Sequence, residues 1–353
     1  MKISDIADII NVTEKDPSTS GIDIFVGLEH YDIAEPVIKR YGSTKMLSTA
    51  AKKFEAGDVL IARRNVYLQR ASVARFAGLT SGDSIVLRVK KNLEVKETDY
   101  DSIRALLPFI LNSINFWDYA NTNADGTMSK RLSPAMLLDY EFNLPPISEQ
   151  KVLAEKLWAA YEVKQSYLKM IEATDEMIKA QFVEMFWGNY PTEKWEDCLS
   201  ITNGKRYDGE YKDSGSYPIC GSAGIMGFGE RKLCDKDTII IGRKGNINSP
   251  IYMEQDYWIV DTAFCLSVDK KKLQPKYFFF WCKQFDFMQY NKQGVLPSLT
   301  RNDLLKIDLP IPPMDLQSSF VDILTQADKS KAELRKSIEA IDKVIKSLIN
   351  ENL

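Results

Sequence analysis

The sequence is poor in the residues that build metal and catalytic centres. It contains one histidine, His30, and five cysteines, which all lie in the second half of the chain without a CxxC spacing. Because a zinc site needs several histidine or cysteine ligands, we expect no metal in this chain. An odd number of widely spaced cysteines is typical of reduced, packed thiols in a reducing compartment.

Long apolar runs and strong charge are also missing. No run approaches the ~20 apolar residues of a membrane helix, and Met1–Asp5 places an acid where a signal peptide would be apolar. We therefore expect a cytoplasmic protein without a membrane partner. The net charge is −3. Bulk charge therefore does not predict nucleic-acid binding, and any such prediction must rest on local charge.

Motifs for catalysis are few. There is no GxxxxGK[ST] motif, and the glycine-rich segment 221–229 lacks the GxGxxG spacing, so we expect it to be a surface loop. Asp197, Glu210 and Lys212 could together serve a metal-dependent nuclease, although such a triplet is common by chance in charged loops. We therefore expect no catalytic residue and no cofactor in this chain. A stand-alone metal-dependent DNA nuclease remains an alternative.

The most informative feature is an internal repeat at an offset of 167 residues. Residues 171–179 read IEATDEMIK, and residues 338–346 read IEAIDKVIK. The same offset aligns Leu144–Gln150 with Ile311–Gln317, and the match continues upstream with insertions. Because the period is far longer than the ~20–50 residues of a solenoid unit, we predict one domain followed by one long helix, duplicated.

Two long helices are predicted after the two Pro-Pro pairs, with Ser148 and Asp315 as their N-caps. The first should run for about 37 residues, or roughly 55 Å. The 4-3 apolar spacing of both helices is typical of a coiled-coil seam, so we expect them to pair with each other rather than each on its own domain. Lys164, Asp175 and Lys331 interrupt the seam. The seam residues are Leu157, Tyr161, Leu168, Ile171, Ile178, Phe182 and Met185, then Phe320, Leu324, Ala327, Leu334, Ile338, Ile341, Ile345 and Leu348.

The two domains are predicted to be mixed α/β. Short β-branched runs bounded by turns indicate strands at Asp58–Ala62, Ile85–Val89, Asp237–Gly242, Pro250–Val260 and Ala263–Val268. Aromatic-rich segments indicate short helices at Leu106–Asn115 and Pro275–Tyr290. The predicted organisation is a first domain over 1–147, a helix over 148–187, a second domain over 188–314 and a helix over 315–353.

Local positive charge gathers in three windows that contain basic residues and no acid: 59–82, 238–253 and 287–302. The arginine fork can grip phosphates or guanine edges, and neighbouring amides can read bases. The alternative is a solvated basic edge that blocks sheet aggregation. The candidate DNA-binding residues are Arg63, Arg64, Asn65, Arg70, Arg75, Lys130, Arg131, Lys205, Arg206, Arg243, Lys244, Asn246, Lys292, Arg301 and Asn302.

The whole pattern resembles the specificity (S) subunits of type I restriction–modification systems. In both halves a variable domain ends in a proline-rich strand, and a glutamine such as Gln150 or Gln317 then precedes a long helix. One departure is the N-terminus, where Met1-Lys2-Ile3 leads directly into the first domain. The second domain begins with the fuller segment Trp195–Leu199, so the first domain is expected to contact DNA differently near its start.

The resemblance implies a non-catalytic, sequence-specific DNA-binding subunit. It implies two target-recognition domains separated by an antiparallel coiled coil with a pseudo-two-fold axis. Each domain would read one half of a bipartite target in double-stranded DNA. The implied partners are two methyltransferase subunits, which would bind S-adenosylmethionine and methylate adenine, and motor–nuclease subunits, which would use ATP and magnesium. A coiled-coil scaffold that does not bind DNA is a further alternative.

Overall fold

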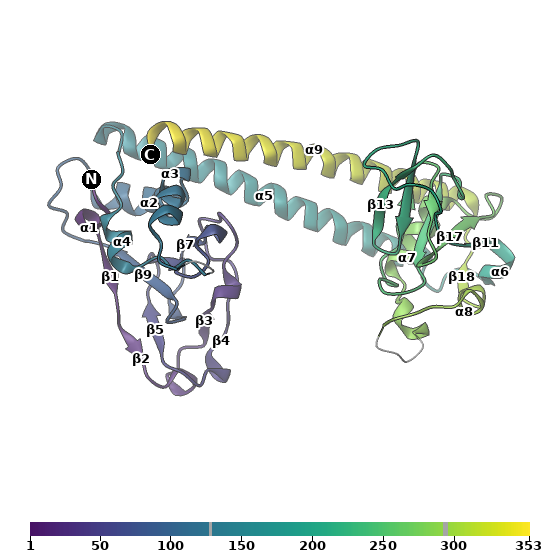
Figure 1. The fold of residues 1–353 in the computed structure, drawn as a ribbon, viewed down its shortest axis with the longest axis horizontal. Helices are drawn as coiled ribbons and strands as arrows, with labels where there is room; N and C mark the ends of the chain where they lie inside the picture. Colours follow the sequence, from purple (N-terminus) through teal and green to yellow (C-terminus); the bar gives the residue numbers. More distant parts are fainter. Residues whose placement is uncertain (127–128, 292–295) are drawn as a thin grey trace. The chain divides into compact units, whose positions relative to one another are not determined.

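The computed structural model describes residues 1–126, 129–291 and 296–353, and the chain divides into two compact units. Unit 1 comprises Met1–Leu168 and Arg335–Leu353, and unit 2 comprises Lys169–Leu334. Helices α5 (Ile147–Phe186) and α9 (Met314–Asn352) each contribute one part to each unit (Figure 1).

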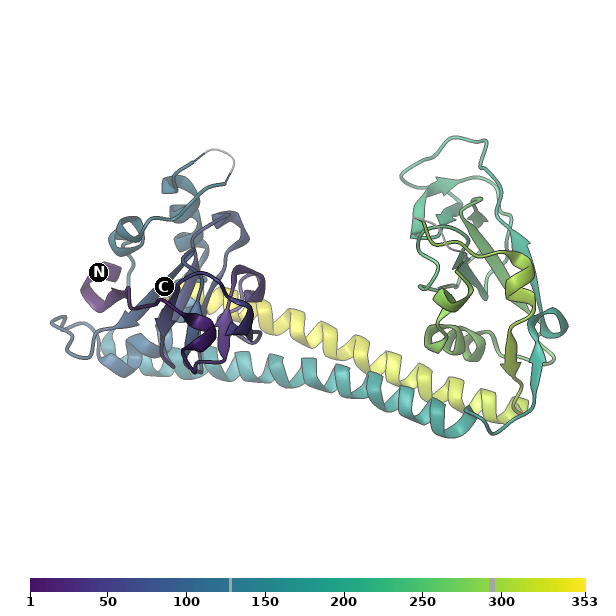
Figure 2. The same cartoon turned by 90° about the horizontal axis from the view of Figure 1, so that it is seen from below.

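Unit 1 has helices on one face of a four-stranded antiparallel sheet and a second sheet on its other face (Figure 2). Alternate residues of a strand point to opposite faces. Val59 and Ile61 of β6 therefore pack with the helices, whereas Leu60 packs toward the second sheet. The first sheet has the order β1 (Ala7–Ile10), β9 (Ser84–Val89), β6 (Val59–Ala62), β7 (Ala71–Val73). The second has the order β2 (Thr13–Glu14), β5 (Ala51–Phe54), β8 (Gly78–Thr80), β3 (Ile24–Val26), β4 (Gly42–Ser43). The short helices are α1 (Ile3–Ile6), α2 (Tyr100–Ile110), α3 (Ile114–Asn123) and α4 (Pro134–Asp139).

Unit 2 repeats this arrangement. Ile239 and Ile241 of β14 pack with helices, and Ile240 packs with Cys220 and Ile259 of the second sheet. The first sheet has the order β11 (Leu199–Asn203), β17 (Ala263–Val268), β14 (Thr238–Gly242), β15 (Ile251–Met253). The second has the order β13 (Gly224–Gly229), β12 (Tyr217–Gly221), β16 (Trp258–Ile259), and β10 (Thr192–Lys194) pairs with β18 (Asp308–Pro310). The short helices are α6 (Trp195–Cys198), α7 (Pro275–Gln284) and α8 (Arg301–Leu305).

The duplication extends to the register of the first sheets. Val59 of β6 lies opposite Leu87, and Ile239 of β14 lies opposite Leu266. A residue with positive φ comes shortly before each of these strands: Gly57 lies two residues before β6, and Asp237 lies directly before β14. The Gly57 amide donates to Ala74 O at 2.7 Å, and the Asp237 amide donates to Met253 O at 2.7 Å. The two domains are therefore the same fold, and residues can be compared between them position by position.

Within each unit, the parts of α5 and α9 pair antiparallel. In unit 1, Lys164 Nζ lies 2.6 Å from Asp342 Oδ1. In unit 2, Lys331 Nζ lies 2.6 Å from Asp175 Oδ1, and further along, the rings of Phe186 and Phe320 are 5.5 Å apart. The predicted pairing of the helices with each other is thus confirmed.

These two ion pairs explain the breaks in the apolar seam. At the offset of 167 residues Lys164 corresponds to Lys331, and Asp342 corresponds to Asp175. The Lys164–Asp342 pair in unit 1 is therefore the repeat of the Lys331–Asp175 pair in unit 2. Lys331 also lies 2.9 Å from Asp328 Oδ1. Burial alone would lower the pKa of Lys331, but its hydrogen bonds to the two carboxylates raise it overall.

A buried glutamine fixes the start of each long helix. Gln150 Nε2 donates to Glu97 O at 2.6 Å and Pro145 O at 3.0 Å, and its Oε1 accepts from Thr98 Oγ1 at 2.6 Å. Gln317 Nε2 donates to Lys272 O and Pro312 O, both at 2.8 Å, and its Oε1 accepts from the Gln274 amide at 2.8 Å. Both glutamines are fully buried. The repeated Pro-Pro and Gln signature is therefore a structural junction between domain and helix.

Several predicted boundaries were wrong. The helices begin at Ile147 and Met314, so Ser148 and Asp315 lie inside the first turn rather than at the cap. The segment Pro250–Val260 forms two strands, β15 and β16, rather than one. Leu106–Asn115 spans the break between α2 and α3, and Pro275–Tyr290 is α7 followed by a 3-10 turn over Phe287–Tyr290.

One further prediction needs correction, and one can be compared with the structure only in part. The glycine-rich segment 221–229 is not a loop, because Gly224–Gly229 pairs antiparallel with β12. The two domains begin in the same way, so the structure does not support a different N-terminal entry, while a difference in DNA contact there stays a prediction. The Ile3 amide donates to Tyr140 O at 3.1 Å, and the Trp195 amide donates to Ile307 O at 3.0 Å, so α1 and α6 occupy equivalent places.

All five cysteines are free and buried. In the part of the chain that the structure describes, no helix is long and apolar enough to cross a membrane. The predicted fold class of two mixed α/β domains with two long helices is confirmed.

Candidate nucleic-acid interface

In unit 1, three chain segments meet at the end of β6. The loop that follows this strand begins with Arg63, whose amide donates to Asp83 O at 2.9 Å. The Asn65 amide donates to Lys130 O at 2.9 Å, and the Leu132 amide donates to Arg63 O at 3.0 Å. The sheet edge therefore brings together two predicted groups of basic residues that are far apart in the sequence.

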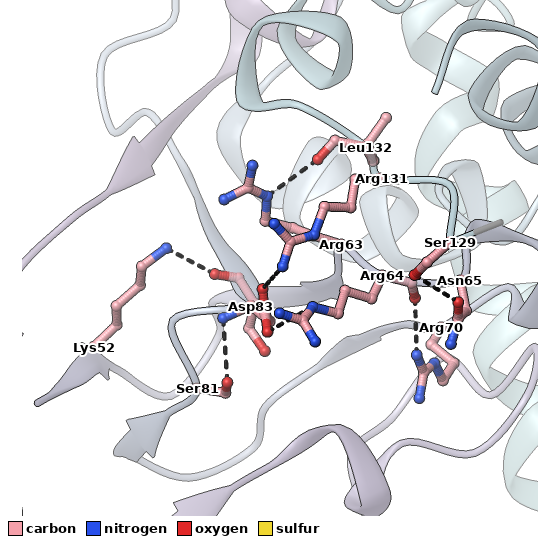
Figure 3. A network of polar contacts seen from close by, with 11 residues as sticks. Lys52, Arg63, Arg64, Asn65, Arg70, Ser81, Asp83, Ser129, Arg131 and Leu132 are labelled. Atoms are coloured by element: carbon pink, nitrogen blue, oxygen red, sulfur yellow. Dashed lines mark hydrogen bonds and ion pairs between the residues drawn. The ribbon is translucent and has the colours of Figure 1, made fainter. Parts of the chain in front are cut away.

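Asp83 organises the arginines of this surface. Its Oδ2 lies 2.9 Å from Arg64 Nε, and its Oδ1 accepts a hydrogen bond from Arg131 Nη2 at 2.8 Å (Figure 3). The carboxylate thus holds two guanidinium groups in place. Both arginines remain partly exposed, with side-chain exposures of 48% and 43%, so their other N–H groups can still reach a ligand.

The neighbouring side chains are tied to the backbone. Arg63 Nε donates to Leu132 O at 3.1 Å, and Arg70 Nη2 donates to Arg64 O at 2.9 Å (Figure 3). Burial lowers the pKa of Arg70. Asn65 has left-handed backbone, and its Oδ1 accepts from Ser129 Oγ at 3.0 Å. These contacts give the loop a defined shape.

Two of the predicted residues face elsewhere. Arg75 pairs with Glu162 of α5 at 2.7 Å, and its guanidinium carbon lies 5.2 Å from the centre of the Trp158 ring. Arg75 therefore packs on the long helix. The ammonium group of Lys130 donates to Asn121 O at 2.5 Å at the end of α3.

The same backbone arrangement recurs in unit 2. The Arg243 amide donates to Thr262 O at 2.8 Å, and the Gly245 amide donates to Pro297 O at 2.9 Å. The Leu299 amide donates to Arg243 O at 3.0 Å. Arg243 therefore corresponds to Arg63, Thr262 to Asp83, and Leu299 to Leu132.

Basic and amide side chains line a hollow of about 390 Å³ at this edge. Its lining includes Asn203, Arg243, Lys244, Arg301 and Asn302. Arg243, Lys244 and Arg301 are exposed, and they make no ion pair with any residue in the described ranges. Four of the predicted DNA-binding residues thus share one positive concavity.

Glycines allow close backbone approach beside this hollow. A Cβ on Gly242 would lie 2.0 Å from Asn246 O, so the tight loop that carries Asn246 requires glycine there. A Cβ on Gly204 would lie 1.8 Å from Val260 O, so only glycine fits at this close backbone approach. Gly204 connects the end of β11 to Lys205 and Arg206. Asn246, Lys205 and Arg206 are exposed. Lys292 lies outside the described residues.

In the predicted nuclease alternative, Lys212 has another partner, because its Nζ lies 3.4 Å from Glu230 Oε1. The backbone oxygen of Asp197, rather than its carboxylate, accepts a hydrogen bond from Lys272 Nζ. Among the residues with described positions, no group of three or more histidine, cysteine or acidic side chains could hold a metal ion. The geometry gives no support to metal-dependent cleavage by this chain.

Sequence reasoning missed Lys52, Asp83 and Asn203. Lys52 Nζ donates to Ser84 O at 2.8 Å; burial, and then the nearby charge of Arg63, lower its pKa. Asp83 did carry a signal, because it directly precedes a strand of the repeat. Its role was not visible, since its arginine partners lie on different segments.

Comparisons with known proteins agree with this picture. Residues 190–342 match the family model of the type I restriction modification DNA specificity domain. No curated protein sequence matches the chain.

Solved structures extend the likeness to the whole chain. The S subunit of a type I restriction-modification system from M. genitalium has 15% identity and a TM-score of 0.61, covering 99% of this chain and 94% of that chain. A structure from a study of the complex assembly and conformational transition of the type I R-M system has 14% identity and a TM-score of 0.60, covering 99% and 96%. Residues 190–342 are therefore similar to the type I restriction modification DNA specificity domain, and the chain as a whole has a fold similar to that of solved type I S subunits.

Proposed function

We propose that this protein is the sequence-specific DNA-binding subunit of a type I restriction–modification complex. The observation that carries the proposal is the basic edge found in both units: around Arg63 in unit 1 and around Arg243 in unit 2, the same hydrogen bonds present cations at the end of the same strand. Because each unit has such an edge, each domain would bind one half of a bipartite DNA target. The similarity of residues 190–342 to a DNA specificity domain supports DNA as the ligand.

The physical basis is phosphate contact combined with base reading. Arg243, Lys244 and Arg301 would neutralise phosphates and release counterions. Arginine can also form paired hydrogen bonds to guanine, and asparagine can form them to adenine. The exposed amides of Asn246 and Asn302 lie next to these cations in the sequence. Which side chains read bases depends on how each domain enters a groove.

We further propose that α5 and α9 set the spacing between the two half-sites. Inserting four residues into both helices would lengthen them by ~6 Å. At ~3.4 Å per base pair, the recognised spacer should then grow by one or two pairs. An unchanged spacer would contradict this part of the proposal.

The chemistry would reside on partner subunits. We propose two methyltransferase subunits that bind S-adenosylmethionine and methylate adenine, and motor–nuclease subunits that use ATP and magnesium. This chain would contribute no catalytic residue and bind no cofactor.

The deciding experiment is single-molecule sequencing of methylated adenines in cells that contain the protein with its modification subunits. The expected result is one two-part motif with an unread spacer. Exchanging residues 243–249 of unit 2 should change one half of the motif only. Loss of this chain without any change in adenine methylation would refute the proposal.

A further inference from the structure

One strand edge is covered in unit 1 and open in unit 2. In unit 1, residues 34–38 lie along the outer edge of β7 as a parallel extension of the sheet. The Val73 amide donates to Pro36 O at 2.8 Å, and Val73 O accepts from the Ile38 amide at 3.0 Å. The covering segment is well packed, because Val37 and Ile38 are 6% and 4% exposed.

Tyr252 of β15 holds the position of Val73. Val73 lies opposite Val59 on β6, and Tyr252 lies opposite Ile239, the counterpart of Val59 on β14. Since successive backbone groups of a strand alternate in direction, the N–H and C=O of Tyr252 point away from β14, as those of Val73 point away from β6. Neither group of Tyr252 has a backbone partner among the residues placed by the structure.

A hollow of about 580 Å³ adjoins this open edge. Its apolar part is formed by Tyr252, Phe279, Phe280 and Leu324. In unit 1 the counterpart of this hollow is smaller, about 430 Å³, and is lined by Val73, Arg75, Ala105 and Trp158 among others. The covering segment lies beside it, where Lys39 Nζ is 5.7 Å from the centre of the Tyr161 ring on α5. Tyr161 is the counterpart of Asp328, which lines the hollow in unit 2.

The charge of the hollow favours an acidic occupant. Lys331 is already paired with Asp175 and Asp328. Lys179 and Lys283 also line the hollow, and neither has an ion-pair partner in the described part of the chain. The covering segment of unit 1 also carries an acid, Glu35, whose side chain is 13% exposed and lies 2.9 Å from Lys39 Nζ of the same segment.

We propose that the outer edge of β15 and this hollow form a docking site for an extended segment of a partner protein, with a carboxylate side chain beside apolar residues. The segment adds a strand to the sheet through Tyr252, places an apolar side chain against the aromatic rings and brings its acid to Lys179 and Lys283. Unit 1 carries an internal example of such an occupant in residues 34–38. The inference does not depend on DNA recognition.

The test uses a labelled synthetic peptide with the sequence of Asp32–Arg40 as the probe and the full-length chain as the receptor. Fluorescence anisotropy should give a Kd on the order of 0.1–1 mM. Hydrogen exchange should slow at the Tyr252 amide, and no protection should be gained at Val73. A peptide carrying Glu35→Lys should bind at least about 5-fold more weakly.

The receptor variant Lys179→Glu/Lys283→Glu should weaken binding by a similar or larger factor. Lys271→Glu, at an exposed lysine outside the hollow, is the matched control and should bind as the unchanged chain does. Circular dichroism checks that each variant is folded.

Several results would overturn the proposal. These are no binding at millimolar peptide, binding without protection of Tyr252, and equal binding of the Glu35→Lys peptide. Self-association of the chain through this edge, or competition by mixed DNA fragments, would identify a different occupant and refute a partner protein. DNA binding is measured separately, so failure here leaves the proposed function standing.

Discussion

The basic edges of the two units share a backbone but differ in one side chain at their centre. Unit 1 has Asp83, which holds Arg64 and Arg131. Unit 2 has Thr262 at the same place, and the surrounding cations lack ion-pair partners within the described ranges. The comparison teaches that one scaffold can present cations in two ways. A carboxylate fixes their geometry and reduces their net charge, whereas its absence leaves them available to phosphate.

The most severe test of this comparison is to give unit 2 the carboxylate of unit 1. Thr262→Asp would pair internally with a cation and repel DNA phosphates. We expect a loss in affinity for the target duplex of about 10-fold or more. The measurement is fluorescence anisotropy with the chain bound to its modification subunits. Thr262→Asn is the neutral control, and an equal loss in that variant would contradict an electrostatic cause.

The next test compares the equivalent arginines. Arg243→Ala should weaken binding to all sequences by about 1–2 kcal/mol and reduce the slope of log K against log salt by about one, if Arg243 contacts phosphate. Arg63→Ala should reduce the slope less, because its Nε is already bound to Leu132 O. A changed target preference with an unchanged slope would instead identify Arg243 as a base-reading residue.

A third test compares the two reciprocal ion pairs of the long helices. Lys331 has an 11% exposed side chain and two carboxylate partners, whereas Lys164 is 25% exposed and has one. Lys331→Met should therefore cost more stability than Lys164→Met, about 1 kcal/mol against about half of that. Methionine retains the packing of the aliphatic stem. Thermal unfolding monitored by circular dichroism measures both, and a larger loss for Lys164→Met would contradict the argument.

The smallest effect is expected from Asp83→Asn. Removing this charge frees Arg64 and Arg131, so binding to unrelated DNA should tighten by about 3-fold with a steeper salt dependence. Discrimination within the half-site read by unit 1 should fall, since the arginines lose their fixed orientation. Weaker binding to all DNA would mean that Asp83 supports the fold rather than the arrangement of the arginines.

The parts of the fold that repeat along the sequence were predictable, because a duplicated pattern carries information twice. The offset of 167 residues located both long helices to within a residue or two. Lys164, Asp175 and Lys331 were recognised as breaks in the seam. Their partnership was not, since it appears only when α5 and α9 run antiparallel.

The candidate interface was predictable in composition but not in assembly. Arg64 and Arg75 share one acid-free window, yet they lie at opposite ends of β7 and face different surroundings. Arg131 joins Arg64 through Asp83 because the fold brings three distant segments together. The strand at Gly224–Gly229 escaped detection because three of its residues are glycines and only Ile225 is β-branched, whereas strands are recognised by β-branched and aromatic residues.

The buried glutamines at the two junctions have a consequence for modularity. Gln317 bonds only to main-chain atoms, and Gln150 bonds to main-chain atoms and one threonine hydroxyl. Main-chain atoms are present whatever the side chains. A domain of the same fold but unrelated surface could thus be grafted at either Pro-Pro pair and be held at the same angle to its helix. New specificities could arise by wholesale exchange of a domain, without any adjustment of the helices.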